Sequence, residues 1–391
     1  MNKLIAMVMA LSAAVATAEV SVTVDGVSQR WPWSKTVDVR YTVSGAEAPV
    51  DIQISATANG GALQVPVGGL AALAQGNGSH LYSWDPSPLA SRQVIADFTP
   101  TLTVLAGSPA YMIVDLDKTP GEEGQLTFIS EDDLHSGAYG SVETNLFDLT
   151  GLAWTGITNE PWYAACTTSK MAFRRIRAGT VQNKSGNPVT VDRDFYEAVF
   201  ELTEAQWRRI TGQTARVKGD AYSRTSVVSY NALRGAKTDE PTVDWPTTGM
   251  RVSPDSIVGR FRHMTGFLQA DIPSAAQWEY ACRAGSSGTT LYNNGKTEYA
   301  LDDIAQPYAD NTKATKPVGG KLPNAWGLYD TIGNVNEWAL DADPSNTSRR
   351  QRRGGSFYGG TRDCSTVYGG NPDDTDGFAM NGARLVINVG N

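Results

Sequence analysis

Gly327-Leu-Tyr-Asp-Thr-Ile-Gly-Asn-Val-Asn-Glu-Trp338 is the stretch that decides the fold of the C-terminal half of this chain. Asp330 and Glu337 supply two carboxylates, and Gly333 between them lets the chain turn. The turn would bring the backbone carbonyls near Gly333 and Val335 to the same point as the carboxylates. Oxygen ligands gathered from side chains and backbone in one tight loop are what Ca²⁺ requires. We therefore predict a calcium site formed by Asp330, Gly333, Val335 and Glu337.

Two further phrases follow in order, Arg353-Gly-Gly-Ser-Phe357 and Gly382-Ala-Arg-Leu-Val386. Together, the three phrases resemble the C-terminal signature of the formylglycine-generating enzyme family, also called the sulfatase-modifying factor family. That signature reads G-L-[YW]-[DN]-x-x-G-N-V-W-E-W, then R-G-G-S-[WF], then G-F-R-L-V. The resemblance implies a variant of the C-type-lectin fold, poor in regular secondary structure, over residues 169–391.

The resemblance also implies a chemistry, in which a pair of cysteines binds copper(I) and a sulfatase cysteine is oxidised to formylglycine. In this chain the first cysteine position is Gly359 and the second is Cys364. Because a pair of soft thiolates is needed to hold Cu(I), we do not expect copper(I) or formylglycine formation by this route. Cys364 and Ser356 are the candidates for any catalysis that remains. The alternative hypothesis is therefore an oxidoreductase of the same family that modifies a sulfatase or another exported substrate.

At the surface where the resemblance implies a ligand, the residues of this chain differ from the family signature. Asn336 stands where the central motif has an aromatic residue, and Ala383 replaces the aromatic of the last phrase. The glycines that shape the fold remain, which is typical of a scaffold reused for binding. We predict that Asn336, Tyr358 and Arg362 contact a ligand, either an unknown protein or a small molecule. A histidine-ligated iron centre is not expected, because only one of the three histidines lies within residues 169–391.

Residues 1–18 have the features of a secretory signal peptide: Lys3, an apolar run over 4–15 and the small residues Ala16-Thr-Ala18. We therefore expect an exported protein that is periplasmic, secreted or at the cell surface. No later apolar stretch is long enough to predict an integral membrane segment. The net charge of −8 argues against nucleic-acid binding.

The predicted fold class is α+β, in two domains. Short runs of alternating apolar residues separated by turn signals predict a β-sandwich of immunoglobulin or fibronectin type over residues 19–116. The last of these runs is Tyr111-Met-Ile-Val114. Residues 117–168 are polar and rich in turn signals, which indicates a connecting segment. The family domain then begins with a strand near Met171.

Three helices are predicted in the family domain from their capping residues. Thr203 and Ser274 each precede a glutamine at the third helical position, which is the pattern of a capping box. Ser253-Pro254 predicts a helix start between them, with Gly266 as its stop.

Overall fold

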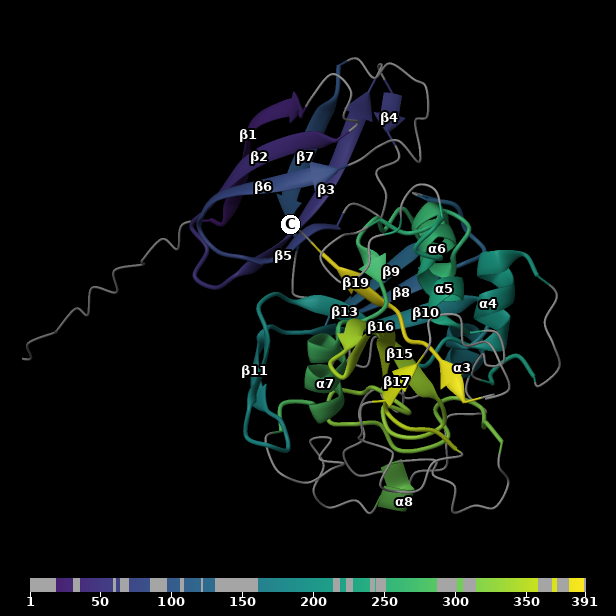
Figure 1. Cartoon of the computed structure of the whole chain (residues 1–391). Helices are drawn as coiled ribbons and strands as arrows, with labels where there is room; N and C mark the ends of the chain where they lie inside the picture. Colours follow the sequence, from purple (N-terminus) through teal and green to yellow (C-terminus); the bar gives the residue numbers. More distant parts are fainter. Residues whose placement is uncertain are drawn as a thin grey trace, which may run out of the picture.

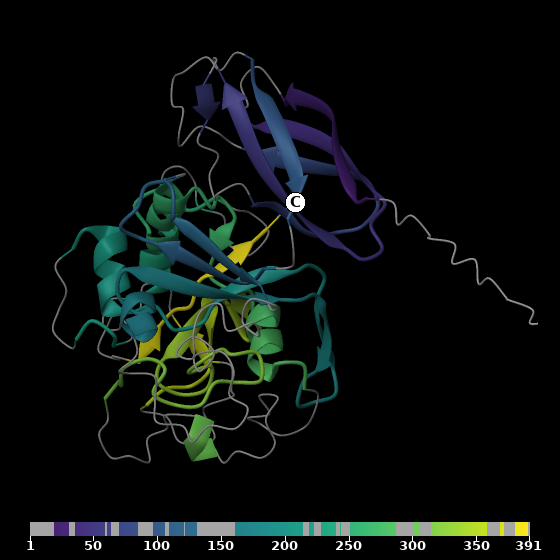
Figure 2. The ribbon, with the colours of Figure 1, turned by 180° about the vertical axis from the view of Figure 1, so that it is seen from behind.

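The structure is a computed structural model of the whole chain. It describes residues 19–30, 36–58, 61–63, 70–84, 97–105, 109–120, 122–130, 161–213, 219–222, 228–239, 243, 251–286, 301–304, 314–357, 368–370 and 380–389. The predicted signal peptide and four residues of interest (Tyr358, Gly359, Arg362 and Cys364) lie outside these ranges. Within these ranges the chain forms an N-terminal part of strands and a larger part of strands and helices, and β19 (Val386–Asn388) points toward the junction between them (Figures 1 and 2).

The N-terminal part consists of two small antiparallel sheets with one shared core. One sheet has the order β1-β2-β6, with β1 (Ser21–Gln29), β2 (Val37–Ser44) and β6 (Gly78–Trp84). In the other, β3 (Val50–Ala58) pairs with β4 (Gly61–Leu63), β5 (Leu70–Gln75) and β7 (Thr99–Val104). Alternation along β2 directs Val39, Tyr41 and Val43 into a core that also contains Ile52 and Ile54 of β3.

A six-stranded sheet forms the centre of the larger part, in the order β14-β19-β13-β10-β8-β9. Its strands are β8 (Pro109–Asp115), β9 (Leu126–Ser130), β10 (Lys170–Ile176), β13 (Phe195–Ala198), β14 (Ala270–Asp271) and β19 (Val386–Asn388). The sheet is buried on both faces: Met112 and Val114 point into one core cluster, while Tyr111 and Ile113 point into another.

This sheet corrects the predicted domain boundary at residue 116. The run Tyr111-Met-Ile-Val114 does not belong to the N-terminal part, because β8 pairs with β10 and places Val114 opposite Met171. A strand covered on both faces reads as a continuous apolar run, and in the sequence alone such a run resembles one more sandwich strand. The segment 117–168, predicted to be a connecting segment, contributes β9 to the sheet and also contains helix α3 (Pro161–Cys166).

Helices cover the central sheet, and the predicted caps place two of them correctly. Thr203 and Ser274 form capping boxes at the starts of α4 (Glu204–Thr211) and α7 (Ala275–Arg283). Helix α6 (Ile257–Thr265) ends at Gly266 as predicted, but it begins at Ser256 rather than Ser253-Pro254. The side chain of Ser256 accepts the N–H of Gly259 and donates to the Ser253 carbonyl, so Ser253 belongs to the preceding turn. The remaining described helices are α5 (Tyr230–Arg234) and α8 (Leu301–Ile304).

A second sheet of the larger part carries the sequence phrases that suggested the family. Its order is β17-β16-β15-β18, with β15 (Asn336–Asp343), β16 (Asn346–Arg353), β17 (Tyr368–Gly370) and β18 (Asn381–Gly382). A separate hairpin consists of β11 (Gly179–Gln182) and β12 (Pro188–Val191). None of the helices within the described ranges is long and apolar enough to cross a lipid bilayer.

Candidate functional site

The predicted calcium loop is held in shape by a carboxylate from elsewhere in the chain. Asp330 and Asn334 have φ of 53° and 49°, so the backbone of this loop turns through the left-handed region. Glu201 accepts the side-chain amide of Asn334 at 2.6 Å and the backbone N–H of Val335 at 3.2 Å. Sequence reasoning missed Glu201, because a contact between residues so far apart in the chain leaves no local pattern.

Arg384, from the last sequence phrase, forms the centre of the site. Its guanidinium donates to both oxygens of Glu337, with Nη2 to Oε1 at 2.9 Å and Nε to each oxygen at 3.2 Å. Its remaining N–H groups donate to the backbone carbonyls of Ala198, Val199 and Tyr329 at 2.6–2.9 Å. Arg384 therefore ties β13, the 330–337 loop and β15 together from a fully buried position.

Glu337 has little capacity left for a metal ion in this arrangement. Its Oε2 also accepts the indole N–H of Trp278 at 2.8 Å, so each oxygen already receives two hydrogen bonds. An ionised carboxylate offers about four such positions. A calcium ion would have to displace Arg384 or Trp278 from Glu337. Within the described ranges, no group of three or more His, Cys, Asp or Glu is arranged to hold a metal ion. The calcium site stays a prediction.

Asp330, the other predicted carboxylate ligand, accepts the N–H of Gly319 at 2.5 Å. Burial raises the pKa of Asp330 to about 6. Burial also raises the pKa of both Glu197 and Glu201 well above the ordinary value. The guanidinium of Arg384 lowers the pKa of all three carboxyl groups but does not offset their loss of hydration.

The Gly-Gly-Ser phrase packs directly against the 330–337 loop. The N–H of Gly333 donates to the carbonyl of Gly354, and the N–H of Phe357 donates to the carbonyl of Asn334, both at 2.9 Å. Gly354 has φ of +87°, and a Cβ at this position would lie 3.2 Å from Trp278. Ser356 is 3% exposed. The glycine therefore serves close packing, and the serine hydroxyl lies inside the protein.

Asn336, a predicted ligand-binding residue, is also buried. It is 7% exposed, and its side chain lies 3.5 Å from the amide oxygen of Asn381. The two other predicted ligand-binding residues, Tyr358 and Arg362, are outside the described residues, as is the candidate catalytic residue Cys364. The structure thus brings together Asp330, Gly333, Val335, Glu337 and Ser356 in one buried arrangement.

Two cysteines lie within the described residues, and neither is suited to complete a copper site. Cys166 and Cys282 are buried free thiols in two separate core clusters. Burial raises the pKa of each thiol to about 12, so both remain protonated near neutral pH. The Cys282 thiol lies 3.7 Å from the carbonyl of Thr331. With Gly359 at the first copper position, the residues present do not fit a two-thiolate copper centre.

The sequence is similar to several known proteins. The chaperone protein LppX of Paenibacillus barcinonensis is 28% identical over 193 residues, which is 41% of this chain and 69% of that protein. The formylglycine-generating enzyme of Mus musculus is 30% identical over 218 residues, which is 43% of this chain and 58% of the mouse protein. The inactive C-alpha-formylglycine-generating enzyme 2 of Bos taurus is 29% identical over 129 residues, 31% of this chain and 38% of the bovine protein.

Among solved structures, Treponema denticola variable protein 1 is similar with a TM-score of 0.42 and 18% identity, over 56% of this chain and 95% of that protein. The sulfatase-modifying factor enzyme 1-like domain matches residues 164–389, more than half of the chain. The three sequence phrases meet inside this region, around Arg384 and Glu337. The chain therefore belongs to the sulfatase-modifying factor, or formylglycine-generating enzyme, family.

Proposed function

We propose that this chain is an exported binding protein of the family that does not generate formylglycine. The observation that carries the proposal is the incomplete cysteine pair: glycine stands at position 359, and the thiols of Cys166 and Cys282 are buried in separate clusters. A thiolate pair is what would hold Cu(I) ready for oxygen. The bovine relative named as inactive is in line with a family member that lacks this activity.

The ligand is an unknown protein or small molecule, bound by Tyr358 and Arg362. The third predicted contact, Asn336, is buried and would have to become exposed to take part. A relative named as a chaperone supports a role on another protein. The N-terminal part, residues 19–105, would act as a sandwich domain of immunoglobulin or fibronectin type that carries the family domain.

Calcium at the 330–337 loop is the second part of the proposal. Support comes from the oxygen-rich loop itself and from the excess of buried carboxylates over arginine around it, because a divalent cation would offset their charge. Asp330 and the backbone carbonyls of the loop would provide ligands, and Glu337 would have to exchange a present partner for the ion.

The test is an aerobic assay of the purified mature protein with copper(I) and a peptide carrying the sulfatase motif Cys-x-Pro-x-Arg. Mass spectrometry would detect conversion of the peptide cysteine, and the mouse formylglycine-generating enzyme is the positive control. No conversion is expected. Conversion that disappears in Cys364→Ser would overturn the proposal in favour of an oxidoreductase with a single cysteine at its site.

A further inference from the structure

The two parts of the chain are joined by a buried series of charges. Arg175 on β10 donates to Asp51 of β3 at 2.5 Å and to Asp194 at 2.9 Å. All three side chains are less than one-tenth exposed. The second oxygen of Asp51 accepts the N–H of Ala74 at 2.9 Å. Because breaking a buried charge pair is costly, these contacts fix the N-terminal part against the central sheet.

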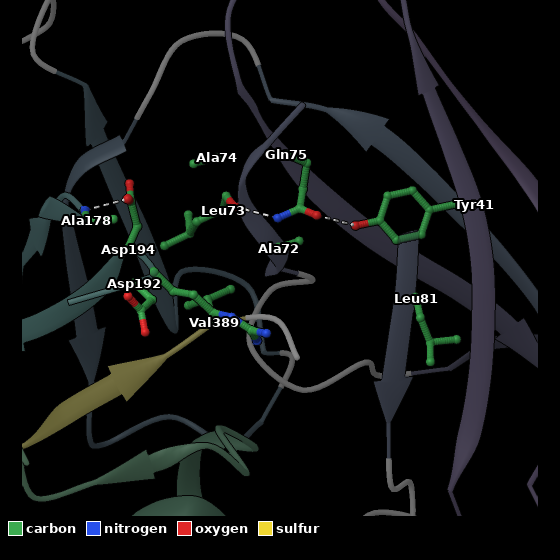
Figure 3. A pocket seen from close by; sticks show the side chains of 11 residues that line it. Tyr41, Ala72, Leu73, Ala74, Gln75, Leu81, Ala178, Asp192, Asp194 and Val389 are labelled. Atoms are coloured by element: carbon green, nitrogen blue, oxygen red, sulfur yellow. Dashed lines mark hydrogen bonds between the residues drawn. The ribbon is translucent and has the colours of Figure 1, made fainter. Parts of the chain in front are cut away.

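Beside this junction lies a cavity of about 350 Å³ with walls from both parts (Figure 3). The N-terminal part supplies Tyr41, Leu81 and the segment 72–75, and the family domain supplies Ala178, Val389 and the segment 192–194. Ligand pockets begin at about 300 Å³, so the cavity suits a molecule the size of a dipeptide. The cavity is remote in sequence from the 330–337 loop. The N-terminal part, which supplies half of the cavity wall, lies at the opposite end of the molecule from α8 (Figure 1).

Most polar groups of the cavity wall are already paired. Gln75 donates to the carbonyl of Leu73 at 2.6 Å and lies 3.4 Å from the Tyr41 hydroxyl. Asp194 accepts the N–H of Ala178 at 2.8 Å in addition to its bonds with Arg175 (Figure 3). These pairs hold the wall in place.

Asp192 and Arg193 are the exception. Both side chains line the cavity and are exposed, and neither makes a hydrogen bond or ion pair with the part of the chain that the structure describes. The cavity therefore offers one carboxylate and one guanidinium to a ligand. Leu81 and Val389 add accessible aliphatic surface to the lining, whereas Ala72 and Leu73 are almost fully buried.

This lining favours one class of small molecule over the others. A nucleobase would lack an aromatic surface for stacking, because Tyr41, the aromatic residue of the wall, is 1% exposed. A phosphate or another polyanion would be opposed by Asp192 beside the single free arginine. A molecule with one positive group, one negative group and an aliphatic body matches all three features of the wall.

We propose that this cavity binds a small zwitterion with an aliphatic side chain, such as a free dipeptide. Asp192 accepts hydrogen bonds from the ligand ammonium, and Arg193 donates to the ligand carboxylate. The aliphatic wall covers the ligand side chain. The site goes beyond the proposed function of the family domain, and it requires the N-terminal part, because half of its wall comes from there.

The test is isothermal titration calorimetry of the full mature chain with the dipeptide alanyl-leucine as the probe. We expect saturable binding, and binding that is weaker by about tenfold or more for N-acetyl-alanyl-leucinamide, which lacks both charges. Asp192→Asn and Arg193→Gln should each weaken binding by a similar factor. Asp220→Asn, an exposed acid on the α4 side of the molecule, is the matched control and should bind the dipeptide like the unchanged protein.

Three results would overturn the proposal: no saturable heat at millimolar dipeptide, equal binding of the uncharged analogue, or unchanged binding in both cavity variants. Both replaced side chains are exposed and have no partner among the described residues, so an unaltered melting temperature checks that the variants are folded. The titration does not involve positions 359 or 364, so its failure and the failure of the copper assay are separate results.

Discussion

Replacing Glu337 by glutamine is expected to lower the free energy of unfolding by about 3 kcal/mol. The glutamine has nearly the same shape and can still accept the indole N–H of Trp278. It leaves Arg384 fully buried and positively charged, with its bidentate partner gone. Breaking a buried ion pair on one side costs about 3–5 kcal/mol, and Glu197, 3.9 Å from Arg384, should keep the loss near the lower end.

The assay is urea unfolding followed by tryptophan fluorescence, with EDTA present so that loss of a bound cation does not contribute. The matched control is Asp255→Asn, which breaks an exposed pair with Arg260 at the same distance of 2.9 Å. Exposed pairs contribute about 0–1 kcal/mol, so this control should change stability little. A loss of less than about 1 kcal/mol for Glu337→Gln, with an unchanged urea dependence, would refute the reasoning that burial makes this pair important.

Four further predictions address the thiols, the buried acid, the metal and the domain boundary. In a variant lacking the third cysteine, Ellman's reagent should label neither Cys166 nor Cys282 in the folded protein and both after denaturation; labelling of the folded protein would contradict their burial. Asp330 should make the free energy of unfolding fall by up to about 3 kcal/mol as the pH rises from about 4 to about 6, because the unfolded chain releases the Asp330 proton first; Glu197 and Glu201 act in the same direction. Asp330→Asn, measured by urea unfolding across that range, should reduce this fall, and an identical profile would rule out this group as its source. EDTA should lower the melting temperature if the loop binds calcium; an unchanged melting curve together with a metal-free elemental analysis would refute the calcium proposal. A chain of residues 109–391 should give a cooperative melting transition by circular dichroism that residues 117–391 lack, and equal transitions would show that β8 is dispensable.

The sequence was sufficient to predict the features that depend on local patterns. The capping boxes at Thr203 and Ser274 place α4 and α7 because a cap and its partner are only three residues apart. The three ordered phrases identified the family because each is a short motif of adjacent residues. The predicted start of α6 at Ser253 was wrong because two nearby serines can each cap a helix by accepting a backbone N–H. Tertiary packing determines that Ser256 does so.

The arrangement of the site depends on contacts that no local pattern records. Glu337 was predicted as a metal ligand from its spacing to Asp330, but its side chain accepts hydrogen bonds from Trp278 and Arg384. Glu201 was not predicted at all, although it holds the loop that carries the site. Buried carboxylates need partners. Which arginine or amide supplies them is decided by the packing of distant segments.

The position of β8 bears on how this protein could have been assembled in evolution. The strand lies inside the larger part's sheet, between β10 and β9, yet in the chain it follows the N-terminal part after residues 106–108. A gene rearrangement that moved the recognisable family region, residues 164–389, would leave β8 and β9 behind and expose an unpaired edge of β10. The unit that can be inherited intact is therefore larger than the region that the family signature marks.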